Sequence, residues 1–91
     1  MSTEFPRAST PRVAKPFRFQ WEEAQACFVL LYPEGMVKLN PAAGEILKRC
    51  DGQRTVDEII SELEAQFSVS GLANDVLEFF VEADGKGWIA T

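Results

Sequence analysis

The chain has 91 residues, of which 46% are hydrophobic, and this size and composition fit one small globular domain. Its net charge of -5 is unevenly divided: residues 1–16 carry three basic and one acidic residue, whereas the remainder carries six basic and 13 acidic residues. An acidic body repels nucleic-acid phosphates and favours basic partners. The chain has no histidine, which excludes histidine-based acid–base catalysis and histidine metal ligands.

No apolar run approaches the roughly 20 residues of a membrane-spanning helix, and the first residues lack the apolar region of a secretion signal. We therefore expect a cytoplasmic protein that does not enter a membrane. The two cysteines, Cys27 and Cys50, each lie among apolar residues. This setting predicts reduced thiols that pack in the core, with a disulfide as the alternative.

Residues 1–16 contain three of the five prolines together with Ser, Thr and basic residues. So few apolar groups cannot offset the entropy that ordering the segment would cost. The composition predicts a flexible N-terminal tail, with a partner-binding arm as the alternative. The folded domain is expected to cover residues 17–91.

Three strands are predicted in the first half of the domain. Residues 17–22 alternate between apolar and polar side chains, as a half-buried strand does. Its inward side chains are expected to be Phe17, Phe19 and Trp21. Residues 26–32 are apolar throughout, which predicts a central strand covered on both faces. The turn at residues 33–35 contains Pro and Gly and leads into a short third strand, residues 36–39.

Three helices should follow the strands. Asn40 is a good N-cap and Pro41 suits the first helical position, while Asp51-Gly52 ends this helix. A capping box, Thr55 to Glu58, opens a second helix with Phe67 among its inward residues. A third helix is expected from about Leu72 to Ala83. The last apolar residues, Trp88-Ile89, are expected either to pair with the sheet or to fill the core.

This order predicts an α+β fold that is winged helix-turn-helix-like, with a three-stranded antiparallel sheet followed by a three-helix bundle. Many winged helices bind DNA through basic or amide side chains on one helix. The second helix here exposes only acidic charges, and the third exposes Asp75, Glu78 and Glu82. The charge pattern therefore excludes a DNA-reading helix, and no nucleic-acid partner is expected.

An enzyme is not expected either. A catalyst needs a nucleophile beside a base, paired carboxylates in a cleft, a metal or a cofactor. Cys27 has no histidine to activate it, and acid pairs such as Glu58 and Glu62 have the spacing of a solvated helix face. Gly85-Lys86-Gly87 lacks the spacing of a phosphate-binding loop. No cofactor and no metal site are predicted.

The short third strand offers the best candidate for a binding surface. A sheet neighbour is assured on one side only, so its other edge would present unpaired N–H and C=O groups. A peptide can add there as a further strand, with backbone bonds supplying affinity and side-chain pockets supplying selectivity. Two alternatives are that the chain covers this edge itself, or that two copies exchange strands there.

The domain contains a series of short motifs: Leu30-Leu31-Tyr32-Pro33-Glu34-Gly35, Leu39-Asn40, Ala43, Ile46-Leu47, Cys50-Asp51-Gly52, Thr55-Val56, Ile59-Ile60 and Asp75-Val76. Together these motifs resemble the PqqD family of pyrroloquinoline quinone (PQQ) biosynthesis. The resemblance covers roughly residues 17–89, and the Tyr-Pro-Glu-Gly turn with Cys-Asp-Gly at this distance is its most specific part. The segment Glu82-Ala83-Asp84 has fewer leucines than the family pattern at the end of the third helix.

The resemblance implies a peptide chaperone that belongs to the RiPP recognition elements. Such a protein binds the ribosomally made precursor PqqA and presents it to the radical S-adenosylmethionine enzyme PqqE. It performs no chemistry itself and holds no cofactor. The rival interpretation is a winged-helix structural or dimerisation module without a peptide ligand. A monomer is the expected functional form, with a strand-exchanged homodimer as the alternative.

The resemblance also implies a site, because related domains take the leader peptide as an extra strand between the third strand and the third helix. Backbone groups of Val37, Lys38 and Leu39 would pair with the peptide. Its apolar pockets would come from Leu31, Val37, Val76 and Phe79, and basic peptide residues would meet Asp75, Glu78 and Glu82. The complete expected site is Leu31, Met36, Val37, Lys38, Leu39, Asp75, Val76, Glu78, Phe79 and Glu82.

Overall fold

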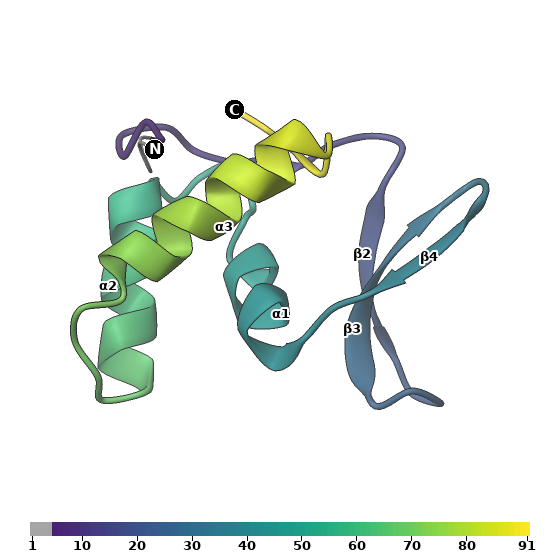
Figure 1. Ribbon diagram of the computed structural model, residues 1–91, viewed down its shortest axis with the longest axis horizontal. Coiled ribbons are helices and arrows are strands. Elements are labelled where there is room, and N and C mark those ends of the chain that lie inside the picture. The colour runs from purple at the N-terminus through teal and green to yellow at the C-terminus, as the bar shows by residue number, and fades with distance from the viewer. Residues whose placement is uncertain (1–4) are drawn as a thin grey trace.

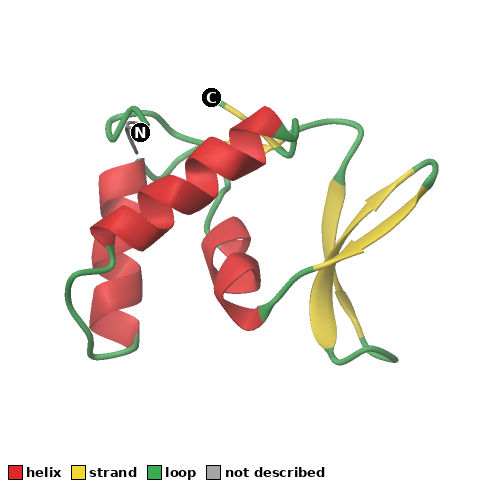
Figure 2. Ribbon diagram, viewed as in Figure 1, coloured by secondary structure: helices red, strands yellow, loops and turns green. Residues whose placement is uncertain are grey.

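A three-stranded antiparallel sheet and three helices form the body of the protein in the computed structural model, which describes residues 5–91 (Figures 1 and 2). The sheet has the order β2-β3-β4, and a separate two-stranded sheet joins β1 to β5. The strands are β1 (Arg12–Val13), β2 (Arg18–Glu22), β3 (Cys27–Tyr32), β4 (Gly35–Lys38) and β5 (Ile89–Ala90). The helices are α1 (Pro41–Lys48), α2 (Val56–Gln66) and α3 (Ala73–Gly85). This arrangement confirms the predicted α+β class.

The central strand β3 is buried at its middle and partly exposed toward both ends, so the prediction of a strand covered on both faces holds only at its centre. Val29 and Leu30 are adjacent and so point to opposite faces, yet both are fully buried. Leu30 pairs with Val37 of β4 and belongs to the hydrophobic core, whereas Val29 lies on the outer face, opposite Lys38. The sheet therefore has an inner face against the helices and an outer face that no helix covers (Figure 1).

Helix α1 begins at the predicted cap and packs directly on β3. The Asn40 side chain accepts a hydrogen bond from the Ala43 amide at 2.7 Å, and Pro41 occupies the first helical position. Gly44 of α1 lies so close to Phe28 that a Cβ at this position would come within 2.9 Å of the Phe28 ring. Glycine is therefore what lets α1 approach the sheet this closely.

The predicted capping box opens α2. Thr55 Oγ1 accepts a hydrogen bond from the Glu58 amide at 3.1 Å, and the Glu58 carboxylate accepts one from the Thr55 amide at 2.8 Å. The inward side chains of all three helices meet in one core with Leu30 of β3. The fully buried members include Phe80, Leu47, Ile59 and Val56.

The N-terminal segment corrects the prediction of a flexible tail over residues 1–16. Residues 5–16 pack against the body, while residues 1–4 lie outside the described part of the chain. Phe5 is 9% exposed and stacks on Phe80 of α3 at a centroid distance of 5.3 Å. Pro11 is also fully buried. Phe5 and Pro11 are therefore buried, and Val13 packs against the core.

Backbone pairing holds the same segment in place. Ser9 and Pro11 carbonyls accept hydrogen bonds from the Val56 and Gly52 amides at 3.0 Å. Strand β1 pairs with β5, so the end of the chain joins the N-terminal segment rather than the three-stranded sheet. Residues 88–89 were predicted either to pair with the sheet or to fill the core. Ile89 does pair as a strand, but with β1, and its side chain is buried in the core at 4% exposure.

Two aromatic residues that were expected to point inward are exposed. Trp21 is 49% exposed, contacts Phe28 edge-on and donates a hydrogen bond to Glu23 at 3.0 Å. Phe67 is 48% exposed because α2 ends at Gln66 and Phe67 is its C-cap. The first helix also ends earlier than predicted, at Lys48. Periodicity extrapolated past the end of an element accounts for the error at Phe67.

Within residues 5–91, no helix is both long enough and apolar enough to span a bilayer.

Candidate functional site

Strand β4 is an open edge of the three-stranded sheet, since no strand among the described residues pairs with its outer side. The Leu39 amide donates to the Phe28 carbonyl at 3.0 Å, which fixes the phase of the β3–β4 ladder. Hydrogen-bonded and non-hydrogen-bonded pairs alternate in an antiparallel ladder, so Val37 also directs its backbone groups toward β3. The backbone groups that point outward are therefore those of Met36 and Lys38.

This geometry corrects part of the predicted site. Of the three residues expected to bind a peptide through their backbones, only Lys38 directs its N–H and C=O groups to the open edge. Val37 and Leu39 use theirs inside the hairpin. Met36, expected in the site without a stated backbone role, supplies the second outward pair.

An apolar cavity of about 500 Å³ opens between α1 and α3. The first residue in the sequence that lines it is Asn40, two positions after the end of β4. One wall is the start of α1, with Pro41, Ala42 and Ile46. The opposite wall is the first half of α3, with Val76 and Phe79. The α2–α3 connection closes the far end with Phe67, Val69 and Leu72. The cavity is therefore an apolar recess beside the open edge.

The charged side chains that line this cavity are both acidic, Glu45 and Asp75. Glu45 is neutralised by Arg49 at 2.9 Å. Asp75 lies in the first turn of α3, where the helix dipole favours a negative charge, and none of the ion pairs within residues 5–91 involves it. Asp75 is therefore the uncompensated charge on the cavity wall, and it favours a basic group on a ligand.

The cavity gathers three of the predicted site residues, Asp75, Val76 and Phe79, and leaves others outside it. Glu78 and Glu82 are exposed on α3 and do not line it, and Glu82 lies 3.8 Å from Lys86. Leu39 is buried between the end of β4 and the start of the cavity wall at Asn40.

Leu31 and Met36 lie on the wrong face of the sheet for the predicted pocket. They are cross-strand partners and therefore share a face, whereas Val37 pairs with Leu30 on the inner face. Leu31 and Val37 therefore cannot line the same pocket, and of the two only Val37 lies on the face toward the helices. The reason is the two-residue period of β-strands, which places neighbouring register pairs on opposite sides.

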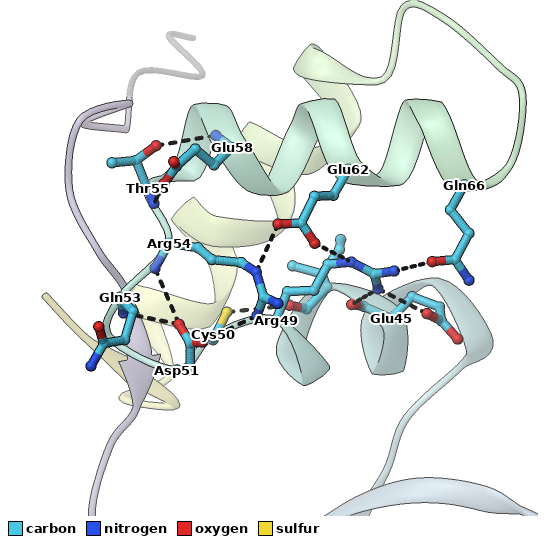
Figure 3. Close-up of polar contacts among 11 residues, drawn as sticks. Glu45, Arg49, Cys50, Asp51, Gln53, Arg54, Thr55, Glu58, Glu62 and Gln66 are labelled. Carbon is cyan, nitrogen blue, oxygen red and sulfur yellow. Dashed lines mark hydrogen bonds and ion pairs between the residues drawn. The ribbon is translucent and has the colours of Figure 1, made fainter.

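A polar network closes the contact between α1 and α2 (Figure 3). The buried guanidinium of Arg49 contacts the Glu45 carbonyl and carboxylate at 2.9 Å, lies 3.4 Å from Glu62, and donates to Gln66. Arg54 bonds the other Glu62 oxygen at 2.7 Å. Because the Arg49 side chain is only 8% exposed, its charge depends on these partners. This network holds in place the helix that carries Glu45.

The cysteines are both free in the structure, which agrees with the predicted thiols and not with a disulfide. Cys50 packs in the core as predicted, but Cys27 is only partly buried and lies outside the core. Burial raises the pKa of the Cys50 thiol to about 12, and the neighbouring Asp51 charge adds to the shift. A thiol with this pKa is not a nucleophile at neutral pH. Residues 5–91 also contain no cluster of side chains suited to a metal ion.

Known proteins with this sequence pattern decide the family. The family model described as "Coenzyme PQQ synthesis protein D (PqqD)" matches residues 27–89. A relative from Acinetobacter baylyi, named PqqA binding protein, is 49% identical over 89% of this chain and 83% of its own length. Another of the same name, from Pseudomonas aeruginosa, is 52% identical over 89% of both chains. This chain belongs to the PqqD family.

A solved PqqD structure has the same fold over nearly the whole chain. It is the solution NMR structure of the PqqD truncation of Methylobacterium extorquens PqqCD, described as a functional and stand-alone RiPP recognition element. The likeness has a TM-score of 0.78 and 26% sequence identity, and covers 98% of this chain and 97% of that one. The alignment therefore includes the N-terminal segment that packs on the helices here.

Membership of the PqqD family confirms the resemblance drawn from the motifs. It also agrees with the prediction that the chain is not an enzyme, because the curated relatives are named as binding proteins and the solved relative as a recognition element. The location of the candidate site rests on the geometry of β4 and the cavity in this chain and not on the relatives.

Sequence reasoning missed the contribution of α1 and the α2–α3 connection to this PqqD cavity. Ala42, Phe67 and Val69 line it, and all three are exposed. One signal was available: Val69 is an apolar residue in a Ser-Val-Ser-Gly loop, where no core position explains it. An exposed apolar residue in a loop beside a cavity is a typical binding feature.

Proposed function

We propose that this PqqD protein, as a monomer in the cytoplasm, binds the precursor peptide PqqA and presents it to the radical S-adenosylmethionine enzyme PqqE. The names of the curated relatives support PqqA as the ligand. The observation that carries the proposal is the outward pair of backbone groups on β4, at Met36 and Lys38, next to an apolar cavity. An extended peptide needs both features, one for its backbone and one for its side chains.

In this proposal the peptide extends the sheet as a strand beside β4. Its alternate side chains then point to opposite faces, so that one set faces the cavity wall at Val76 and Phe79. A basic peptide residue pairs with Asp75, and further basic residues meet Glu78 and Glu82 on the exposed face of α3. Burial of apolar side chains contributes about 25 cal/mol per Å².

The same geometry supports the proposed presentation to an enzyme. An added edge strand is bonded on one side only, so its other edge and one set of its side chains stay accessible to an enzyme. The groups that PqqE modifies in the peptide would therefore remain outside the cavity. The PqqD chain contributes the bound conformation and leaves the chemistry to its partner.

The proposal is tested by removing one outward backbone N–H and comparing the result with a variant that loses only the side chain at the same position. Lys38→Pro deletes an N–H that points to the open edge, and proline is tolerated at such edge positions. Lys38→Ala is the matched control, because it removes the same charge but keeps the amide. We expect Lys38→Pro to weaken PqqA binding by about 10- to 100-fold relative to Lys38→Ala, since one hydrogen bond is lost and a peptide carbonyl is left unpaired.

Isothermal titration calorimetry with PqqA measures this difference, and thermal unfolding checks that both variants fold. Equal affinities for the two Lys38 variants would contradict strand addition on β4. Leu39→Pro provides the contrast, because its amide bonds Phe28 and its loss should lower stability rather than affect the peptide alone.

A further inference from the structure

The outer face of the three-stranded sheet is a second surface that the cavity does not use. Cross-strand pairing places Leu31 with Met36, and Cys27 with Glu22, on this face. Val29 on this face is fully buried, Cys27 and Leu31 are partly exposed, and Met36 is 40% exposed. All three helices lie on the other side of the sheet (Figure 1). The face is therefore apolar at its centre and open to a partner.

The charges around this face have the opposite sign to the rest of the domain. Residues 17–91 contain six basic residues, and Arg49, Arg54 and Lys86 are in ion pairs. Within the described chain, Arg18 and Lys38 form no ion pair, and both lie on the outer face, as partners of Leu31 and Val29. Two positive charges thus flank the apolar residues.

The acid of this face is Glu22, at the end of β2. It is engaged within its own turn, where its carboxylate accepts a hydrogen bond from the Ala24 amide at 3.1 Å. The outer face therefore carries a net positive charge, whereas the cavity on the inner side carries the uncompensated Asp75. Two surfaces of opposite charge, separated by β4, are suited to two different ligands.

We propose that the outer face of β2–β3–β4 docks the enzyme that receives the peptide, through an apolar patch on that enzyme ringed by carboxylates. The inference rests on the proposed function, since it assigns a surface to the presentation step. A peptide strand on β4 would extend this same face, so the docked enzyme would contact the set of peptide side chains that points away from the cavity.

Charge argues against the other occupants of this face. A second copy of the chain, related by a two-fold axis, would bring two net positive faces together. A basic peptide segment would be repelled by Arg18 and Lys38 and attracted to Asp75 instead. An acidic-rimmed protein surface is the partner that gains from both the apolar centre and the positive rim.

The test reverses the two charges with Arg18→Glu combined with Lys38→Glu. Lys48→Glu is the matched control, because Lys48 is an exposed basic residue on α1 that forms no ion pair in residues 5–91 and does not lie on this face. We expect the double variant to bind purified PqqE about tenfold more weakly at low salt. Arg18→Glu alone, on β2 and away from the proposed peptide strand, should also weaken PqqE binding, while its PqqA affinity changes less than about threefold. Lys48→Glu should leave both affinities near wild type.

Unchanged PqqE affinity in the double variant, with the fold intact by thermal unfolding, overturns the inference. So does a wild-type self-association in sedimentation velocity that the double variant abolishes, because it assigns the face to a second copy. The peptide titrations keep the two proposals apart: a wild-type protein that binds PqqE but not PqqA contradicts peptide binding and not the docking face.

Discussion

Helix α1 makes two different contacts, one closed and one open. Toward α2, the buried guanidinium of Arg49 joins the more exposed side chains of Glu45, Glu62 and Gln66 in a polar network. Toward α3, the same helix leaves an apolar cavity of about 500 Å³. The two contacts are linked through Glu45, which bonds Arg49 and also lines the cavity.

The difference between these contacts assigns stability to the α2 side of the helix and ligand binding to its α3 side. The closed contact uses directional ionic bonds, which hold α1 at a set position along α2. The open contact leaves apolar surface unpaired, which weakens packing and keeps a site for a ligand. Stability should therefore depend on the α2 side and binding on the α3 side.

The largest expected effect comes from opening the closed contact. Arg49→Ala would leave Glu45 without its ionic partner and Gln66 without its donor, while Glu62 keeps Arg54. Losing hydrogen bonds to a charged group costs about 1.5 to 3 kcal/mol, and we expect a clear fall in the free energy of unfolding measured with urea. Lys48→Ala, the exposed neighbour on α1, is the control and should change it by less than about 0.5 kcal/mol.

If Arg49→Ala were as stable as Lys48→Ala, the network would have no structural importance. The contrast between the two sides of α1 would then rest on the cavity alone.

A smaller effect, on affinity alone, is expected from filling the open contact. Ala42→Phe places a ring at the cavity wall from an exposed position of α1. We expect PqqA to bind about tenfold more weakly, equivalent to about 1.4 kcal/mol, with the unfolding midpoint unchanged. Ala65→Phe, exposed on α2 and away from the cavity, is the matched control. Full affinity in Ala42→Phe would exclude this cavity from the peptide site.

The smallest effect concerns Asp51, at the outer end of the polar network. Backbone hydrogen bonds from Gln53 and Arg54, and then the Arg54 charge, lower the pKa of its carboxyl from the ordinary value of an aspartate. A folded-state pKa below the unfolded value stabilises the fold above the unfolded pKa, and the gain is lost as pH falls through the folded pKa. Asp51→Asn should thus be less stable than wild type near neutral pH.

Urea midpoints of the wild type and Asp51→Asn should converge as the pH falls below about 3.8. A constant difference between them across this range would mean that ionisation of Asp51 does not contribute.

Local rules account for the parts of this fold that the sequence predicted well. The cap at Asn40, the capping box at Thr55 and the apolar run of β3 each act over a few residues, so a short stretch contains the whole cause. The open edge at β4 was predicted for the same reason. Which of its amides face outward depends on hairpin register, which the alternating pattern alone left open.

Long-range contacts account for what the sequence did not show. Phe5 is ordered by Phe80, which lies 75 positions later in the chain, so no local composition could indicate its burial. The partners of Arg49 on α2 come from tertiary packing, for which the local sequence carries no signal. The cavity is likewise formed by three separated segments, and only its α3 wall was predicted.

The contact between Gly44 and Phe28 has a consequence for redesign of peptide selectivity. At this point α1 already lies as near the sheet as a glycine allows, so any side chain added there would push the helix away. The distance from α1 to the β3–β4 hairpin is thus a fixed dimension of the scaffold. A PqqD variant that accepts bulkier leader residues should be sought by trimming Phe79 on the opposite wall or Leu72 in the α2–α3 connection, with Gly44 left untouched.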